Sequence, residues 1–496
     1  MQAAPAPKTI ARYVLGATIA DGERPCVLGP TPLSRSNLRR RVAERASEFL
    51  DAGMQTDEFV VVLCGRGERF WIDLLALWVI GAKPVCLEPE VADDHAANVV
   101  DLTSPRFICA VGDELPASLA ALDSLDDSDR MGSPSATLRD LPWVTADHQP
   151  ELAGLIFTSG TTGLPKGVPL SHEQLVMNAL ATRDRLRLRR DDRLMIATPF
   201  RFISSISHFI VTLMCGAAFH GVETTLMPKD LVDELAAARI TAFGGSPFHC
   251  QFIAMAGTER LPDLRWLMSS GDHLPSSMID QLLSAFPDLE LHVVYGMAEM
   301  GGRICSLPPD DVERKKGSVG LPISGIELDV YGEDGEPAPA GEIGELHVDG
   351  PFRFTGYLSN PSANEAVLGD HGFHTGDKGY RDDDGFIFLA GRSDSVFKRS
   401  GLKVSSQVIT DALKDLPEIG DAFVRPEPDS MEGHVPVAYL VTWAPFDRTE
   451  VVRRLRDVLA SNHIPKRFVE VPSIPRTGSG KVDRRALNAV IDAVES

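Results

Sequence analysis

The sequence has little cysteine, and none of it is arranged in pairs. Seven cysteines, an odd number, are spread over 496 residues with no CxxC spacing. Several fall in apolar runs such as VVLC and FICA. This pattern favours buried thiols in a reducing compartment over a disulfide framework, so we expect a cytoplasmic protein.

Targeting and membrane-spanning segments are also lacking. The N-terminal stretch MQAAPAPKTIARYVLG has no cationic start followed by an apolar core, so no signal peptide is predicted. The longest weakly charged stretch, Phe202–Phe219, contains three serines, a threonine and a histidine. It is too polar for a membrane span, and we interpret it as a buried helix that borders a pocket.

Positive charge is in short supply. The chain has 49 Lys and Arg against 70 Asp and Glu, a formal net charge of −21. Such a surface repels phosphate backbones and anionic lipids, which argues against nucleic-acid and membrane-surface roles. The apolar fraction of 43% and charged fraction of 24% are ordinary for a globular protein and exclude a disordered or fibrous chain. The length predicts several folding units.

The first part of the chain alternates between helix and strand patterns. Residues 34–53 have helical apolar spacing, and 68–80 form an apolar helix. Strands are expected at 59–64, 83–87 and 106–110, which predicts a largely parallel sheet covered on both faces. Residues 121–148 are rich in Asp, Ser, Gly and Pro and predict a surface loop.

From about residue 326 the texture changes to short segments punctuated by glycine, proline and aspartate, such as IELDVYG and GFIFLAGR. This is typical of antiparallel strands and turns. After Arg392 a charged connector, a strand–helix pattern and a terminal helix near 481–494 predict a small α+β domain. We therefore place an N-terminal domain at 1–392 and a C-terminal domain at 393–496.

One segment, LIFTSGTTGLPKG at 155–167, is dense in hydroxyls and glycines directly after a predicted strand. Such a loop exposes backbone N–H and O–H donors that can surround a polyphosphate, and Lys166 adds positive charge. It lacks the GxxxxGK[ST] spacing of a Walker loop. The residues expected to face the phosphates are Thr158, Ser159, Gly160, Thr161, Thr162, Gly163 and Lys166.

The string TSGTTGLPKG closely resembles the phosphate loop of the adenylate-forming superfamily, which includes acyl-CoA synthetases, peptide-synthetase adenylation domains and luciferases. Further stretches resemble that superfamily in the same order along essentially the whole chain. They are YGMAE at 295–299, GEIGELHVDG at 341–350 with Gly356-Tyr357, TGD at 375–377, GRSD at 391–394 and PRTGSGKVDR at 475–484.

The resemblance implies an α/β fold: a large N-terminal domain of stacked α/β sheets with a β-rich subdomain, and a small mobile C-terminal domain joined by a hinge. It also implies a reaction in which a carboxylate attacks the α-phosphorus of ATP and leaves an acyl-adenylate. Bringing two anions together is the difficulty, so catalysis should rest on positioning and charge neutralisation.

Several residues receive roles from the resemblance. Glu299 would hold Mg²⁺ on the phosphates, since a hard cation prefers oxygen ligands. Asp377 would accept hydrogen bonds from the ribose hydroxyls, and Arg392 would reach ribose or phosphate. Tyr295 would stack on adenine. The remaining nucleotide-binding positions are Asp272, Gly296 and Ala298.

The resemblance also places two lysines and a hinge in the C-terminal region. Lys481, in TGSGK, would reach the carboxylate and α-phosphate and offset their repulsion. The small domain of the family then rotates about a hinge, here Asp394, and Lys481 leaves. Lys398 would enter and serve the second half-reaction, although a solvated lysine is an equal alternative.

The sequence departs from the family pattern at three positions. Ala298 replaces the usual Thr and removes one hydrogen bond to the α-phosphate, worth about 1 kcal/mol or more. Phe202 replaces a gating His, and Ile203 replaces the Asp that binds an amino group, which disfavours amino-acid substrates. KVSSQVI after Gly401 also differs from the usual pattern and makes the second conformation less certain.

The predicted acyl pocket is apolar with a few hydroxyls, which suggests a medium-sized hydrophobic or aryl carboxylate. Its residues are Phe202, Ile203, Ser207, Phe243, Gly245, Ser270, Gly271 and Met297. Four further side chains are candidates to contact a second polar group, with structural roles as the favoured reading: Arg201, His208, His249 and Arg303.

The predicted function is therefore an acid–thiol ligase that uses ATP, Mg²⁺ and coenzyme A, acting as a monomer or homodimer. The short stretch between Tyr357 and His374 favours coenzyme A as the acceptor. One alternative is transfer to an acyl carrier protein or an amine. A second is a catalytically weak paralogue that acts as a binding module, supported only by Ala298.

Overall fold

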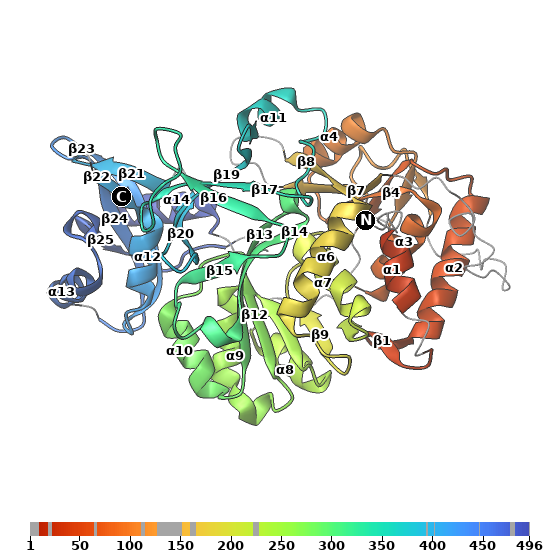
Figure 1. Cartoon of the computed structure of the whole chain (residues 1–496), viewed down its shortest axis with the longest axis horizontal. Coiled ribbons are helices and arrows are strands. Elements are labelled where there is room, and N and C mark those ends of the chain that lie inside the picture. Colours follow the sequence, from red (N-terminus) through yellow and green to blue (C-terminus); the bar gives the residue numbers. More distant parts are fainter. Residues whose placement is uncertain are drawn as a thin grey trace.

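A computed structural model describes residues 9–17, 22–63, 67–110, 115–125, 151–158, 165–221, 228–392, 395–400, 402–445, 447–476 and 482–495. The strands of these residues form sheets of fourteen, six and five members. In Figure 1 the N-terminal segments (red and orange) lie at one end of the molecule and the C-terminal segments (blue) at the other. The α/β class predicted from the sequence is confirmed.

The six-stranded sheet follows the predicted alternation. Its order is β6-β5-β3-β4-β7-β8, with only the β7–β8 pair antiparallel. Every residue of β4 is buried, which requires cover on both faces of the sheet. The strands are β3 (Phe59–Leu63), β4 (Lys83–Leu87), β5 (Phe107–Cys109), β6 (Asp123–Ser124), β7 (Leu152–Thr158) and β8 (Lys166–Ser171).

Two helices near this sheet, α2 (Arg35–Asp51) and α3 (Glu68–Ile80), begin and end close to where the sequence places them. The helices α1 (Ile10–Ala17) and α4 (Asp93–Thr103) were not predicted. Ser34 caps α2, because its hydroxyl accepts a hydrogen bond from the Asn37 amide. The buried side chains of α2 include Leu38, Val42 and Phe49, which recur at helical spacing.

The large sheet has a parallel half and an antiparallel half. Its parallel half is built from β1 (Pro25–Leu28), β9 (Arg193–Ile196), β10 (Ala218–His220), β11 (Ala242–Gly245), β12 (Trp266–Ser270) and β13 (Glu290–Met297), with β2 (Leu33–Ser34) antiparallel at its edge. The helices between these strands are α6 (His172–Leu186), α7 (Ile203–Met214), α8 (Pro228–Ala237), α9 (Pro247–Arg260) and α10 (Ser276–Ala285).

The antiparallel half continues from β13 without a break. It contains β14 (Gly302–Leu307), β15 (Ser318–Pro322), β16 (Glu327–Tyr331), β17 (Gly344–Asp349), β18 (Leu368–Gly369), β19 (Gly372–Arg381) and β20 (Ile387–Arg392). The predicted antiparallel strands are thus confirmed. β14 pairs with β13 of the parallel half, and β15 pairs with both β14 and β20. The antiparallel strands therefore continue the large sheet and do not form a separate one.

The C-terminal segments form their own sheet and small cores. The strands are β21 (Val396–Arg399), β22 (Leu402–Ser405), β23 (Ile419–Asp429), β24 (Gly433–Thr442) and β25 (Arg467–Glu470). The helices are α12 (Ser406–Lys414), α13 (Arg448–Val458) and α14 (Arg484–Glu495). Side chains such as Ile409, Leu440 and Leu455 are buried within this part. The boundary between 392 and 393 stays a prediction.

Two local expectations are corrected. The helix predicted within 202–219 ends at Met214, where Gly216 takes a positive φ of 79°, and Ala218–His220 then form β10. Within the predicted loop at 121–148, Asp123–Ser124 pair with β5 because they continue the parallel sheet at its edge. The rest of that loop, from 126, lies outside the described residues.

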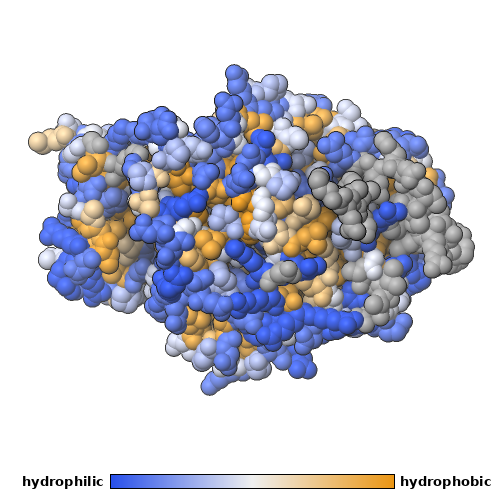
Figure 2. Space-filling view, viewed as in Figure 1, coloured by the Kyte–Doolittle hydropathy of each residue, from blue (hydrophilic) through white to orange (hydrophobic). Residues whose placement is uncertain are grey.

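The visible face of the molecule is largely polar. Hydrophilic residues (blue) cover much of the face in Figure 2, and hydrophobic residues (orange) show between them. Among the described residues, no helix is long and apolar enough to cross a membrane.

Candidate active site

The motif Tyr295–Glu299 lies where β13 ends and the short helix η2 (Ala298–Met300) begins. Gly296 is required by a close approach of backbone: a Cβ atom here would lie 1.9 Å from the carbonyl oxygen of Gly302 on β14. The turn that follows buries Glu299, which is only 8% exposed. The strand end therefore presents a carboxylate in a restricted environment.

Asp377 is the centre of a cluster that joins three strands. The Tyr295 hydroxyl donates a hydrogen bond to Asp377 Oδ2 at 2.7 Å, and Arg392 Nη1 donates to Oδ1 at 3.0 Å. Asp377 and Arg392 are direct cross-strand neighbours on β19 and β20. Because a carboxylate has about four lone-pair positions, Asp377 keeps acceptor capacity for a diol such as that of ribose.

The orientation of Asp377 depends on an irregularity in β19. Glu345 of β17 pairs with Lys378, but His347 pairs with His374, so β19 bulges at Thr375-Gly376-Asp377. Gly376 takes a φ of +71° in this bulge, a conformation that glycine adopts without strain. The Thr375 hydroxyl donates to the Leu346 carbonyl and accepts from the Asp377 amide. The hydrogen bonds of the TGD motif therefore hold the Asp377 carboxylate in position.

Glu299 is held by a residue to which the sequence analysis assigned no role. The Tyr357 hydroxyl donates to Glu299 Oε1 at 2.9 Å. The Lys166 ammonium lies over the Tyr357 ring, with Nζ 4.9 Å from the ring centroid. Tyr357 therefore links Glu299 to Lys166, the last residue of the predicted phosphate loop. The position of Tyr357 in the Gly356-Tyr357 motif was the sequence feature that could have indicated this role.

Both tyrosines stay protonated and act as donors. Burial, followed by the nearby Asp377 carboxylate, raises the pKa of Tyr295 well above its ordinary value. Burial and Glu299 raise the pKa of Tyr357, whereas Arg392 lowers it. The influence of Arg392 on Tyr357 places the Asp377 and Glu299 clusters within electrostatic reach of each other. The stacking of Tyr295 on adenine stays a prediction.

The β7–β8 hairpin brings together the two ends of the predicted phosphate loop. Thr158 and Lys166 face each other in register across these antiparallel strands. The Leu358 amide donates to the Gly167 carbonyl, which anchors the same hairpin beside Tyr357. The loop residues Ser159, Gly160, Thr161, Thr162 and Gly163 lie outside the described residues, so their phosphate contacts stay predictions.

Asp272 lies at the junction with the C-terminal part. Its carboxylate is 3.6 Å from Arg476 Nη1, and Arg476 also forms an ion pair with Asp421 at 2.7 Å. These three residues line a cavity of about 390 Å³ between the two parts of the chain. The predicted contact of Asp272 with adenine stays a prediction.

Of the two predicted lysines and the hinge residue, the structure describes only Lys398. Lys398 lies on β21 with a side chain 62% exposed and its Nζ 3.4 Å from a carboxylate oxygen of Glu333. In this arrangement it is a solvated lysine, and a role in the second half-reaction stays a prediction that requires rotation. Asp394 and Lys481 lie outside the described residues.

The predicted acyl-pocket residues come from neighbouring elements. Ser207 and Phe243 are buried, and Phe202, Ile203, Ser270 and Met297 are half-buried; Gly245 ends β11, and Gly271 follows β12 with a φ of +90°. Two of the polar candidates have structural partners. Arg201 pairs with Glu88 at 2.7 Å, and His249 accepts the Ser246 amide hydrogen bond in the capping box of α9.

Arg303 and His208 form a buried pair beneath this region. Arg303 Nη2 lies 2.6 Å from His208 Nε2, and the His208 Nδ1 lies 2.6 Å from the Ser204 carbonyl oxygen. Since a carbonyl only accepts, Nδ1 carries the proton and Nε2 accepts from Arg303. Burial, with the adjacent guanidinium, lowers the pKa of His208 well below its ordinary value, so the ring is neutral.

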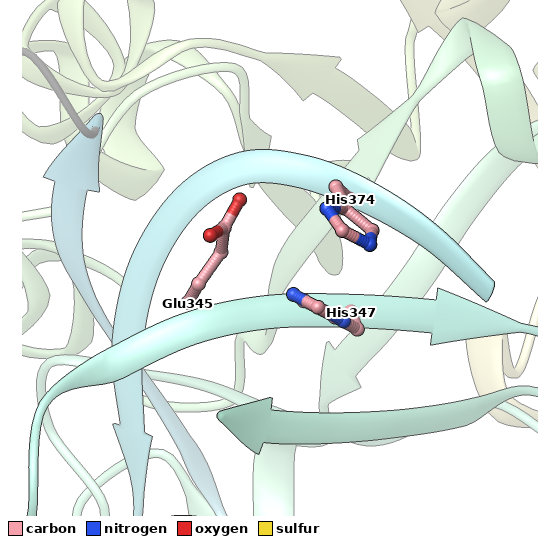
Figure 3. A group of neighbouring side chains, drawn as sticks. All are labelled: Glu345, His347 and His374. Carbon is pink, nitrogen blue, oxygen red and sulfur yellow. The ribbon is translucent and has the colours of Figure 1, made fainter. Parts of the chain in front are cut away.

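A second group of potential metal ligands lies outside this site. Figure 3 shows Glu345, His347 and His374 on the neighbouring strands β17 and β19, and their ligand atoms lie within 4.8 Å of one another. The His347 and His374 rings stack at 4.0 Å. Imidazole suits zinc-like metals, whereas Mg²⁺ prefers oxygen ligands, so this group does not fit the Mg²⁺ expected on a nucleotide. Glu299, an oxygen donor beside the phosphate loop, does fit it.

Comparison with known families agrees with this geometry. A family model described as "AMP-binding enzyme" matches residues 19–358. A second model, described as "AMP-binding enzyme C-terminal domain", matches residues 409–481.

Individual relatives span nearly the full chain. A 2-succinylbenzoate–CoA ligase of Bacillus licheniformis is 28% identical over 479 residues, which cover 93% of this chain and 95% of that protein. Among solved structures, the anthranilate CoA ligase AuaEII in complex with anthranoyl-AMP superimposes with a TM-score of 0.87 at 20% identity, covering 99% of both chains. The O-succinylbenzoate coenzyme A synthetase of Bacillus subtilis in complex with AMP gives 0.81 at 22% identity, covering 96% and 98%.

Proposed function

The chain belongs to the AMP-binding enzyme family, and we propose that it is an acid–CoA ligase. In this proposal the enzyme uses ATP to convert a carboxylic acid into an acyl-adenylate with release of pyrophosphate. The thiol of coenzyme A then attacks the acyl carbon and displaces AMP. The relative from Bacillus licheniformis is named as a CoA ligase, and the alignment with this chain covers 95% of its length. This similarity supports coenzyme A as the acceptor.

The observation that carries the proposal is the meeting of Asp377, Arg392 and Tyr295, which come from the three strands β19, β20 and β13. A carboxylate fixed by two donors, with acceptor capacity to spare, suits a vicinal diol. The Arg392 guanidinium adds a planar cation for ribose or phosphate oxygens. Motif residues that are far apart in sequence thus form one polar cluster.

Glu299 is the residue that would hold Mg²⁺ on the ATP phosphates. Tyr357 occupies one of its carboxylate oxygens and leaves the other available as a ligand. The bound metal would neutralise phosphate charge as a Lewis acid. Lys166, near the same tyrosine, adds a second positive charge at the end of the loop.

Pyrophosphate release with a panel of carboxylic acids, ATP and Mg²⁺ tests the proposal, each acid being run with and without coenzyme A. We expect release with one class of acid, faster turnover with coenzyme A, and acyl-CoA detected by mass spectrometry. The variant Asp377→Ala should lose most of this activity through weaker nucleotide binding, whereas the exposed Arg314→Met should match the parent.

The outcomes separate the competing functions. Pyrophosphate release without acyl-CoA would point to a carrier-protein thiol or an amine as the acceptor. ATP binding without release, for every acid class, would contradict the ligase and favour a binding module in which Ala298 has cost the enzyme its chemistry.

A further inference from the structure

Arg303 is a buried cation with no anionic partner in the described part of the chain. The residue is 2% exposed, and no described residue accepts a hydrogen bond from its Nε or Nη1 atom. Among the residues that the structure describes, no carboxylate forms an ion pair with it. Its one side-chain hydrogen bond is to the neutral ring of His208. Burial lowers the pKa of the guanidinium to about 9, so it still carries its charge at neutral pH.

The other buried arginines of the described chain have anionic or carbonyl partners. Arg45 binds Asp73 at 2.7 Å and Glu48 at 2.7 Å. Arg35 donates to the backbone carbonyls of Gly216 and Ala217. Arg35 also has no carboxylate partner among the described residues, and its Nε and Nη1 are unpaired there, but two carbonyl oxygens accept from its Nη2. Arg303 differs in that its side chain faces a neutral imidazole, with the sulfur of Met268 3.2 Å from the same ring nitrogen.

Burying a guanidinium without an anion is unfavourable, and a charge of this kind is normally paired or near the surface. His208 supplies no compensation, because its Nδ1 proton is committed to the Ser204 carbonyl and its ring is neutral. Within the part of the chain that the structure describes, nothing supplies an acceptor for Nε and Nη1, so these two donors are open to an acceptor from a bound molecule. A carboxylate matches the guanidinium best, in charge and in the spacing of its two oxygens.

The position of the Arg303–His208 pair indicates which ligand could supply the carboxylate. His208 lies on α7, one residue after Ser207, and the same helix begins with Ile203. Arg303 lies on β14 opposite Gly296, beside Met297 on β13. A Cβ atom on Gly302 would lie 3.4 Å from the Ser207 hydroxyl, so these elements are in contact. The pair thus lies among the segments that carry the predicted acyl pocket.

We propose that Arg303 binds a second carboxylate of the substrate, so that the acid activated by this enzyme is a dicarboxylic acid. This inference rests on the proposed ligase function and adds the substrate class. One carboxylate would react with ATP near Lys166 and Asp377, while the other would complete the charge of Arg303. His208 would orient the guanidinium as a positioning residue.

The first experiment measures stability without any reaction. An unpaired buried cation costs stability in the ligand-free protein, so Arg303→Met should unfold at the same or a higher temperature than the parent. A dicarboxylic acid at saturating concentration should raise the unfolding temperature of the parent but not of Arg303→Met. A markedly lower unfolding temperature of the ligand-free variant would mean that Arg303 has a structural partner, and would overturn the inference.

The second experiment compares matched substrates. Short aliphatic and aryl dicarboxylic acids are each assayed beside their monomethyl esters, which keep size and one reactive carboxylate but lose the second charge. We expect the parent to prefer a diacid over its ester by at least about 100-fold in kcat/KM. Arg303→Met should lose this preference, mainly because its kcat/KM for the diacid falls while its kcat/KM for the ester changes little. The control Arg314→Met, an exposed arginine paired with Asp311 and Asp384, should keep it.

The results distinguish failure of the inference from failure of the function. Equal pyrophosphate release from diacid and monoester, with acyl-CoA formed, would retain the ligase and overturn the dicarboxylic substrate. Preference for the ester, or for an acid with a neutral acceptor, would also overturn it. No release from any acid would contradict the ligase itself, and the substrate assignment would fall with it.

Discussion

Tyr357→Phe tests how Glu299, the proposed magnesium ligand, is held. The substitution removes the hydroxyl that donates to Glu299 Oε1 at 2.9 Å but keeps the ring beneath the Lys166 ammonium. A hydrogen bond to a charged group contributes about 1.5–3 kcal/mol. If that energy holds Glu299 in place for the metal, its loss lowers kcat/KM for ATP by roughly 10–100-fold, at about 1.4 kcal/mol per factor of ten.

The assay is pyrophosphate release at fixed ATP over a series of Mg²⁺ concentrations. We expect Tyr357→Phe to need more Mg²⁺ for half-maximal activity and to recover partly at high Mg²⁺. Tyr380→Phe is the matched control, because Tyr380 stacks on Phe388 and its hydroxyl has no hydrogen bond among those described. An unchanged Mg²⁺ dependence in Tyr357→Phe would refute the positioning of Glu299 by Tyr357.

Three further predictions follow from other contacts. Gly296→Ala should lower the free energy of unfolding by about 1–3 kcal/mol in a denaturant titration, because its Cβ would overlap the Gly302 carbonyl; an unchanged midpoint would contradict this. Burial raises the pKa of Asp411 from 3.8 to about 6, so the folded state holds this proton more tightly and stability should fall as pH rises from 4 to 6. Asp411→Asn should remove that part of the pH dependence in melting curves, and a parallel profile would contradict it. Lys481→Ala should abolish acyl-adenylate formation with the fold intact, whereas Lys398→Ala should slow only transfer from pre-formed acyl-adenylate; loss of both steps, or of neither, in Lys398→Ala would count against its role.

The contacts between the two parts of the chain explain why the C-terminal predictions depend on a rearrangement. Arg476 is fixed by Asp421 and faces Asp272 across the cavity, and the Ser277 amide donates to Asp415. These polar contacts are of the kind that open without a large loss of buried apolar surface. Lys398 is exposed and pairs with Glu333 in this arrangement, so its predicted role in the second half-reaction requires rotation.

Much of the fold was predictable from local patterns. The helix at 68–80 and the strand at 83–87 agree with α3 and β4 in both bounds, because long apolar runs bordered by glycine leave few alternatives. The helix predicted to 219 was too long, since its apolar composition continues through Gly216 into β10. Apolar content alone does not distinguish a buried helix from the buried strand that follows it.

The sequence by itself determined the family, the order of the motifs and the residue types of the proposed nucleotide site, because those depend on local strings such as TSGTTGLPKG and TGD. Only the tertiary structure decided which side chains meet. Tyr357 reaches Glu299, Tyr295 reaches Asp377, and Arg303 is left with His208 and no anion. Such pairings join residues from different strands, and the burial that makes an unpaired charge significant is a property of the packed molecule, which no local pattern records.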